Sequence, residues 1–282
     1  MTAPALHILS LPSARERRGT LLALPGLAES AEAMLPTLRH WRSRGFDILA
    51  MDPRGHATSA RWSRALLERH AGDVILADLL TSLNGMTKIT APLILFGHSA
   101  GGAAAAALAA RLGDRVGAVV LEDPFWRLPV TRFQDPRVAE RASADLRRVK
   151  AMSPAARIKE IRALFPRWPE DELDAWARAK DDTDIALVAD GHVIASRGWP
   201  SDVRALVQAG VPILVVTGTI RTGMTPNHRA ILRALGAEVV VVRGATHFIR
   251  RDDRAAFHAL VDGFLDRHVP RQTARPSNTS AP

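Results

Sequence analysis

Short apolar runs alternate with amphipathic stretches through the first half of the chain. This alternation is typical of a parallel sheet flanked by helices, since the strands of such a sheet are buried on both faces. The apolar runs predict strands at Leu6–Leu11, Thr20–Leu24, Phe46–Met51, Pro92–Phe96 and Val116–Leu121. Helical spacing of the apolar residues predicts helices at Glu29–Arg44, Asp73–Leu83 and Ala103–Leu112. We therefore expect an α/β protein with a doubly wound, mostly parallel sheet.

The pattern changes after Phe125, where the chain becomes rich in Arg, Asp, Glu, Pro and Trp. Helical pieces are predicted near Val138–Lys150, Ala155–Ala163 and Glu170–Ala179, and the apolar run Ile185–Val188 predicts a short strand. We interpret residues 124–203 as a helical cap inserted into a core formed by residues 1–123 and 204–269. The core pattern resumes with strands at Ile213–Thr217 and Glu238–Val242 and helices at Asn227–Leu235 and Asp253–His268. The polar, Pro-rich residues 270–282 are expected to be a disordered tail.

Composition narrows the function classes. The chain of 282 residues lacks cysteine, which excludes disulfides, thiol catalysis and Cys-based zinc sites. The net charge of +9 comes from 38 basic and 29 acidic residues, but the arginines are scattered among acidic residues and form no basic stripe with aromatics. We therefore expect no nucleic-acid partner. We also expect no signal peptide and no membrane partner, and we predict a cytoplasmic location.

The sequence Gly97-His98-Ser99-Ala100-Gly101 lies between the apolar run Pro92–Phe96 and the helix predicted at Ala103–Leu112. A serine on so tight a strand-to-helix turn takes a strained backbone conformation, and the flanking glycines avoid clashes with neighbouring elements. The turn raises the serine hydroxyl above the sheet edge and leaves backbone N–H groups free beside it. Ser99 is therefore the predicted nucleophile.

A serine nucleophile needs a base and donors for the oxyanion. His247, in Gly244-Ala245-Thr246-His247, follows the strand Glu238–Val242 and is the predicted base, because the carboxyl ends of parallel strands meet at one edge. One oxyanion donor is predicted to be the N–H of Ala100, at the start of a helix. The second is predicted to be the N–H of Leu27, in the loop after Thr20–Leu24.

These motifs together resemble the α/β-hydrolase fold family over roughly residues 5 to 268. The matching segments are Leu24–Leu27, Asp52–His56, Gly97–Gly101 and Gly244–His247. The resemblance implies that Leu24–Leu27 forms the oxyanion loop, although Pro25 stands where the family usually has His. It also implies that Asp52-Pro53-Arg54-Gly55-His56 is a structural turn and takes no catalytic part.

The triad acid departs from the family pattern. Family members usually carry it just after the strand equivalent to Ile213–Thr217, but this chain has no Asp or Glu between Asp202 and Glu238. The acid could instead follow the preceding strand, at Asp123 or Glu122, as in certain haloalkane dehalogenases. Strand alternation favours Asp123. In the alternative, no acid is present and a Ser–His dyad remains.

Three aromatic residues lie near the hinges where the cap joins the core, and we predict that they line the substrate pocket: Phe125, Trp126 and Trp199. Trp168 and Trp176 suit the interior of the cap. No metal-ligand spacing or nucleotide-binding motif occurs, so we expect no cofactor. The leading hypothesis is a serine hydrolase that cleaves a small carboxylic ester, lactone or amide. Two alternatives are a hydrolase-like protein used for ligand binding or for lyase or cyclase chemistry, and a cofactor-free perhydrolase or haloperoxidase.

Overall fold

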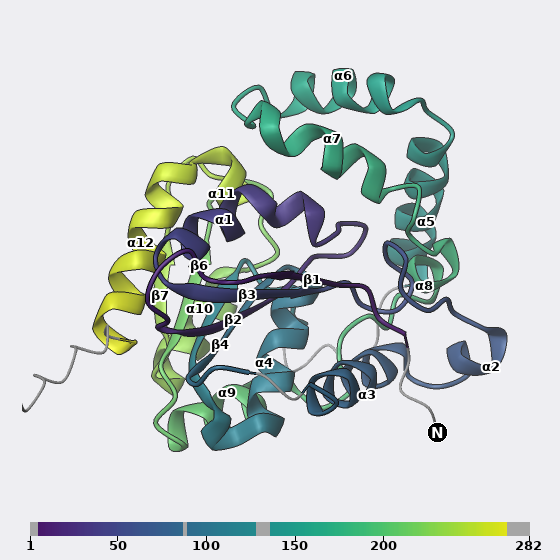
Figure 1. The fold of residues 1–282 in the computed structure, drawn as a ribbon. Coiled ribbons are helices and arrows are strands. Elements are labelled where there is room, and N and C mark those ends of the chain that lie inside the picture. The colour runs from purple at the N-terminus through teal and green to yellow at the C-terminus, as the bar shows by residue number, and fades with distance from the viewer. Residues whose placement is uncertain (1–4, 87–88, 128–135, 270–282) are drawn as a thin grey trace, which may run out of the picture.

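A seven-stranded sheet forms the centre of the computed structural model, which describes residues 5–86, 89–127 and 136–269 (Figure 1). The strand order is β1-β3-β2-β4-β5-β6-β7, and only the edge pair β1–β3 is antiparallel. The strands are β1 (Ile8–Leu11), β2 (Gly19–Leu24), β3 (Phe46–Met51), β4 (Leu93–His98), β5 (Val116–Glu122), β6 (Ile213–Thr217) and β7 (Glu238–Val241). The predicted doubly wound, mostly parallel sheet is confirmed.

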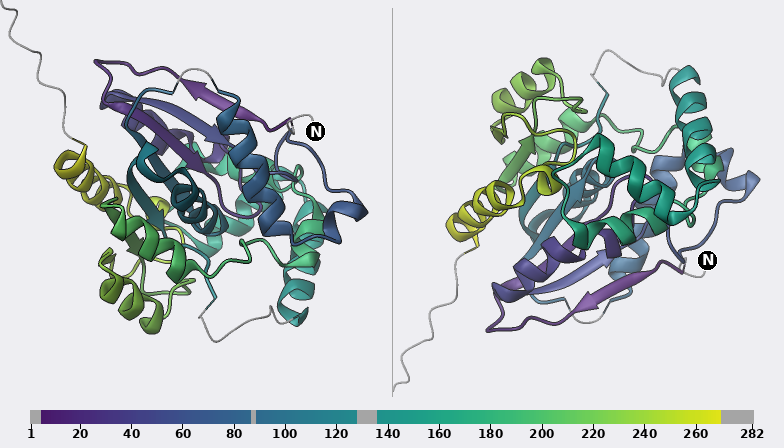
Figure 2. Two further views of the ribbon diagram at one scale, coloured as in Figure 1. Left: turned by 90° about the horizontal axis from the view of Figure 1, so that it is seen from below. Right: turned by 90° about the horizontal axis from the view of Figure 1, so that it is seen from above.

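Helices cover both faces of this sheet (Figure 2). Successive residues of a strand point to opposite faces, so Leu21 packs on one side and Leu22 on the other. One face is covered by α1 (Leu35–Ser43) and α12 (Arg254–His268). The other face is covered by α3 (Ala71–Asn84), α4 (Ala100–Leu112), α9 (Trp199–Gln208) and α10 (Pro226–Leu235).

The helical insert comprises α5 (Pro136–Lys150), α6 (Pro154–Leu164), α7 (Glu170–Ala179) and α8 (Ile185–Asp190). In Figure 1, α6 and α7 lie at the top, beyond the sheet. Helix α7 contacts α1, and its Glu172 bonds Arg251 of α11 (Ile249–Asp252). The short elements are α2 (Arg64–Leu67) and the 3₁₀ turns η1 (Glu32–Met34) and η2 (Gly113–Arg115). The exact cap boundaries at 124 and 203 stay a prediction.

The prediction of a strand at Ile185–Val188 is wrong, because these residues form the first part of helix α8. The helix buries Leu187 and Val188, contacts α5, and ends at Gly191 in the left-handed conformation with φ 74°. An apolar run this short fits a strand or one face of a buried helix equally well. The packing of α8 on α5 decides between them.

Two further differences concern the start of one helix and the presence of another that the sequence did not predict. The helix predicted from Glu29 begins only at η1, and this leaves Glu29 in a buried loop. Helix α9 was not predicted, although Trp199, Val203 and Leu206 follow helical spacing and face α4. The tail predicted at 270–282 lies outside the described residues.

Candidate active site

Ser99 lies at the turn between β4 and α4, with φ 53° and ψ −120°. Its backbone is fixed by β5 and by the chain that follows it: the Ser99 N–H donates to the Glu122 carbonyl at 3.0 Å, and its carbonyl accepts from the Phe125 N–H at 2.9 Å. Positive φ is costly for a residue with a Cβ and persists only where the surroundings hold it. The side chain remains partly exposed. This is the geometry of a nucleophile elbow.

Glycines make the elbow possible because the chain passes very close to itself there. A Cβ on Gly101 would lie 2.2 Å from the Leu24 carbonyl oxygen, and one on Gly97 would lie 2.3 Å from the Gly101 carbonyl oxygen. Both contacts are with backbone atoms, which cannot rotate away.

We therefore expect Gly101→Ala to lower the free energy of unfolding by about 3 kcal/mol. The matched control is Gly263→Ala in α12, where the nearest atom to the new Cβ is the end of the Arg267 side chain at 3.8 Å. That change should raise the free energy of unfolding by up to about 1 kcal/mol, since alanine is the better helix former. Urea denaturation followed by circular dichroism measures both values, and equal stability of Gly101→Ala and wild type would refute the close approach.

The carboxylate of Asp123 contacts the imidazole of His247, with Oδ2 bonded to Nδ1. Asp123 directly follows β5, is fully buried and has φ 37°. Its Oδ2 also accepts from the Gly223 N–H at 2.6 Å, and its Oδ1 accepts from the Thr217 hydroxyl at 2.5 Å. The last residue of β6 and the segment after it, where the usual acid is missing, thus supply donors that orient the carboxylate at the end of the neighbouring strand.

Glu122 points to the opposite face of the sheet, as strand alternation requires. Its Oε1 accepts from the Arg250 N–H at 2.8 Å, and its Oε2 accepts from the Arg250 guanidinium at 2.5 Å. Both oxygens are engaged away from His247. Of the two carboxylates considered from the sequence, only Asp123 reaches the histidine.

His98, which directly precedes Ser99, connects the elbow with the loop of His247. The Nε2 of His98 is 3.0 Å from the His247 carbonyl oxygen, and the two rings lie 4.8 Å apart between centroids. Gly26 belongs to the same cluster, because a Cβ built on it would lie 3.3 Å from the Cβ of Ser99. The elbow, the His247 loop and the loop after β2 therefore converge at the carboxyl edge of the sheet.

A cavity of about 20 Å³ beside the elbow is lined by both predicted oxyanion residues, Leu27 and Ala100, together with Gly26 and Gly101. Among the described residues, neither the Leu27 N–H nor the Ala100 N–H has an acceptor. Ala100 also stands at the N-terminus of α4, where the helix dipole favours negative charge. The two N–H groups are free to receive an anion.

The loop that carries Leu27 is held from the core by His56. Its Nε2 accepts from the Ala28 N–H at 3.2 Å, and its Nδ1 lies 3.3 Å from the Arg54 carbonyl. Burial lowers the pKa of His56 to about 4, which keeps the ring neutral and its Nε2 available as an acceptor. One residue of the Asp52–His56 turn thus positions the neighbouring loop, and the purely structural role of this turn stays a prediction.

Sequence reasoning missed a buried charged cluster below the site. Arg250 and Arg251, which soon follow His247, are fully buried and both bond to the carboxylate of Glu29. That carboxylate also accepts from the Gly26 N–H at 3.2 Å and bonds His98 Nδ1 at 2.7 Å. Burial alone would raise the pKa of Glu29, but the charges of Arg250 and Arg251 outweigh it and hold this pKa well below 4.5. In the sequence, the one indication of this cluster is a pair of adjacent arginines shortly after the predicted base.

Two groups of aromatic side chains are formed, one by Trp126 and Trp199 and the other around Phe248. Trp126 and Trp199 stack on each other with centroids 4.7 Å apart and are buried, while Phe125 stays partly exposed. Their substrate contacts remain predictions. Phe248 is not among the predicted pocket residues. Its ring lies 5.2 Å from that of His247 and packs in the cap cluster of Phe165, Trp168 and Trp176.

Comparison with known protein families gives a match that covers most of the chain. Residues 15–219, which include Ser99 and Asp123, match the family described as serine aminopeptidase, S33. The chain belongs to this family of α/β-hydrolases. The matched range ends before His247. No curated protein matches the chain in sequence.

Several solved structures share the fold of this α/β-hydrolase. N-formylmaleamic acid deformylase from Pseudomonas putida S16 has a TM-score of 0.71 at 19% identity, with 92% of this chain and 96% of that chain covered. E-2-(acetamidomethylene)succinate hydrolase has a TM-score of 0.70 at 18% identity, covering 93% and 96%. The enol-lactonase from Burkholderia xenovorans LB400 has a TM-score of 0.66 at 24% identity, also covering 93% and 96%. At these identities the likeness shows the fold.

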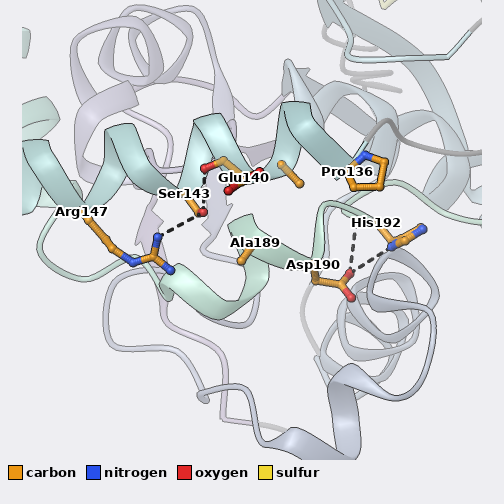
Figure 3. A pocket seen from close by; sticks show the side chains of 8 residues that line it. Pro136, Glu140, Ser143, Arg147, Ala189, Asp190 and His192 are labelled. Atoms are coloured by element: carbon orange, nitrogen blue, oxygen red, sulfur yellow. Dashed lines mark hydrogen bonds and ion pairs between the residues drawn. The ribbon is translucent and has the colours of Figure 1, made fainter.

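The cap of this α/β-hydrolase holds a larger cavity of about 400 Å³ between α5 and α8. In Figure 3, Arg147 turns toward Ser143 on one side and Asp190 toward His192 on the other. None of the residues predicted for catalysis lines it. Within residues 5–86, 89–127 and 136–269, no group of three or more His, Cys, Asp or Glu could hold a metal ion. Likewise, none of the described helices is long and apolar enough to cross a membrane.

Proposed function

We propose that the protein is a serine hydrolase that cleaves a carboxylic ester, lactone or amide of modest size through an acyl-enzyme. The observation that carries the proposal is the contact of the buried Asp123 carboxylate with His247, at the edge where Ser99 forms a nucleophile elbow. A carboxylate on Nδ1 holds the imidazole so that Nε2 can act as the base.

In the proposed mechanism, the hydroxyl of Ser99 attacks the substrate carbonyl and gives its proton to His247. Negative charge moves to the carbonyl oxygen, where the N–H groups of Leu27 and Ala100 stabilise it. His247 then protonates the leaving alcohol or amine, and the acyl group stays on Ser99. Water, activated by His247, attacks the acyl-enzyme and releases the acid. Asp123 stabilises the imidazolium in each half-reaction.

The names of the structural neighbours suggest which classes of acyl substrate to assay. Two of them are, by name, a deformylase of an amic acid and a hydrolase of an acetamido compound, and a third is an enol-lactonase. The family description adds an aminopeptidase. Amides and lactones thus stand beside simple esters as substrate classes to assay.

Replacement of Ser99 by Ala tests the proposal. We expect Ser99→Ala to lower kcat on short and medium p-nitrophenyl esters by a factor of about 10⁴ or more, because no other group can form the acyl-enzyme. The control is Ser201→Ala on the exposed surface of α9, which should behave like wild type. Hydrolysis is followed at the p-nitrophenolate absorbance, with folding checked by circular dichroism. Residual activity of Ser99→Ala close to wild type would rule out the nucleophile.

A further inference from the structure

Lys180 reaches from the cap to the loop that carries Leu27. It lies at the C-terminal end of α7 and is only 9% exposed. Its Nζ donates to the Ala28 carbonyl at 2.7 Å and lies 4.3 Å from the centroid of the Trp176 ring. A buried ammonium is costly unless it is bonded, so this contact is a built feature of the interface.

Both the N–H and the carbonyl of Ala28 form hydrogen bonds with side chains. Its N–H donates to His56 of the core at 3.2 Å, and its carbonyl accepts from Lys180 of the cap at 2.7 Å. Its φ of 60° is unfavourable for a residue with a Cβ and needs such support. The preceding residue is Leu27, so these two bonds restrain the backbone that directly follows the Leu27 N–H.

We propose that Lys180 is a positioning residue that holds the loop of Leu27 in the conformation needed for oxyanion binding. This inference rests on the proposed hydrolase function. It makes the oxyanion site dependent on the docked cap: when the cap moves away, the Ala28 carbonyl loses its donor and the loop of Leu27 loses its hydrogen bond to the cap. Lys180 does not touch the reacting atoms.

The charges around Lys180 come from several elements. Glu29 of the same loop attracts the ammonium, as does Asp145 of α5, whereas Arg251 of α11 and Arg157 of α6 repel it. Burial, the largest effect, lowers the pKa of Lys180 to about 8. Above that pH the amine is neutral and donates a weaker hydrogen bond. A decline of kcat at alkaline pH, with a midpoint near 8, is therefore expected for the wild type.

The experiment compares Lys180→Met and Lys180→Arg with Lys150→Met. Lys150 is the matched control, because its Nζ also donates to backbone carbonyls, those of Asp181 and Thr183, but it bonds only within the cap. The readouts are kcat and KM on a p-nitrophenyl ester and the inhibition constant of a trifluoromethyl ketone, which forms an oxyanion on the serine.

We expect Lys180→Met to lower kcat about tenfold to a hundredfold, because the oxyanion loses part of its stabilisation by the Leu27 N–H. The inhibition constant of the trifluoromethyl ketone should rise by a similar factor, and KM should stay within about twofold of the wild-type value. Lys150→Met should match wild type. Lys180→Arg keeps its charge at alkaline pH, so it should lack the decline near pH 8 whatever its absolute rate. That profile tests the inference even if Lys180→Met folds poorly.

Four outcomes would overturn the inference. The first is unchanged kcat and inhibition in folded Lys180→Met. The second is a rise in KM alone, which would mean that Lys180 contacts the substrate or only packs the cap. The third is an equal loss in Lys150→Met. The fourth is an alkaline decline that persists in Lys180→Arg.

In all four, wild type still hydrolyses esters and Ser99→Ala does not. Absence of hydrolysis in wild type would instead overturn the proposed function together with this inference.

Discussion

Asp123→Asn is expected to lower kcat/KM by about 10⁴ while the protein stays folded. The asparagine has nearly the same shape, but it carries no charge to stabilise the His247 imidazolium. It also has only one acceptor oxygen, whereas the carboxylate accepts from Thr217 and Gly223 and bonds His247. The amide NH₂ must therefore face a donor or present a proton to Nδ1, and the latter stabilises the wrong tautomer of the base.

The measurement is steady-state hydrolysis of a p-nitrophenyl ester by Asp123→Asn, with Asp114→Asn in the exposed turn η2 as the matched control. Asp114→Asn should retain wild-type kcat/KM. A loss smaller than about tenfold in Asp123→Asn would mean that the catalytic unit is a Ser–His dyad and that the contact with His247 is structural.

Arg250→Met is expected to lower the free energy of unfolding by about 3–5 kcal/mol, since removal of one partner leaves buried carboxylates uncompensated. Arg250 is fully buried and bonds both oxygens of Glu122, which is also fully buried. The backbone N–H of residue 250 keeps one of these bonds, so the loss falls on the guanidinium contacts to Glu122 and Glu29. Methionine fills the space but offers no charge.

Urea denaturation at neutral pH measures the effect, with Arg267→Met as the matched control. Arg267 pairs with Glu238 on the surface, at 55% and 45% side-chain exposure, and surface pairs contribute little. Its replacement should change the free energy of unfolding by less than about 1 kcal/mol. Equal losses in the two variants would contradict the role assigned to the buried cluster.

Much of the fold could be predicted because its strands are buried on both faces and separated by helices with one apolar side. The run Phe46–Met51 and the run Ile213–Thr217 coincide with strands β3 and β6. The run Ile185–Val188 could not be assigned in this way, since four apolar residues carry no reliable period. Its helix depends on contacts with α5 that are distant in the sequence.

The candidate site was predictable where local chemistry marks it. Gly97 and Gly101 predict a tight turn around Ser99, and the position of His247 after a strand predicts that it is the base. The partners of these residues depend on tertiary contacts: Glu29 meets Arg250 across 221 residues, and Lys180 meets the carbonyl of Ala28 across 152. Polar side chains of these types are usually solvated, so nothing in their spacing distinguishes buried pairs from surface charges.

The central claim is that Ser99 is an activated nucleophile, and labelling with a fluorophosphonate tests it most directly. The wild type would be incubated with the reagent, digested and mapped by mass spectrometry. The account predicts a single adduct on the peptide containing Ser99, formed much more slowly in Asp123→Asn and absent in Ser99→Ala. A folded wild type that acquires no adduct, or acquires one on another serine, would contradict it.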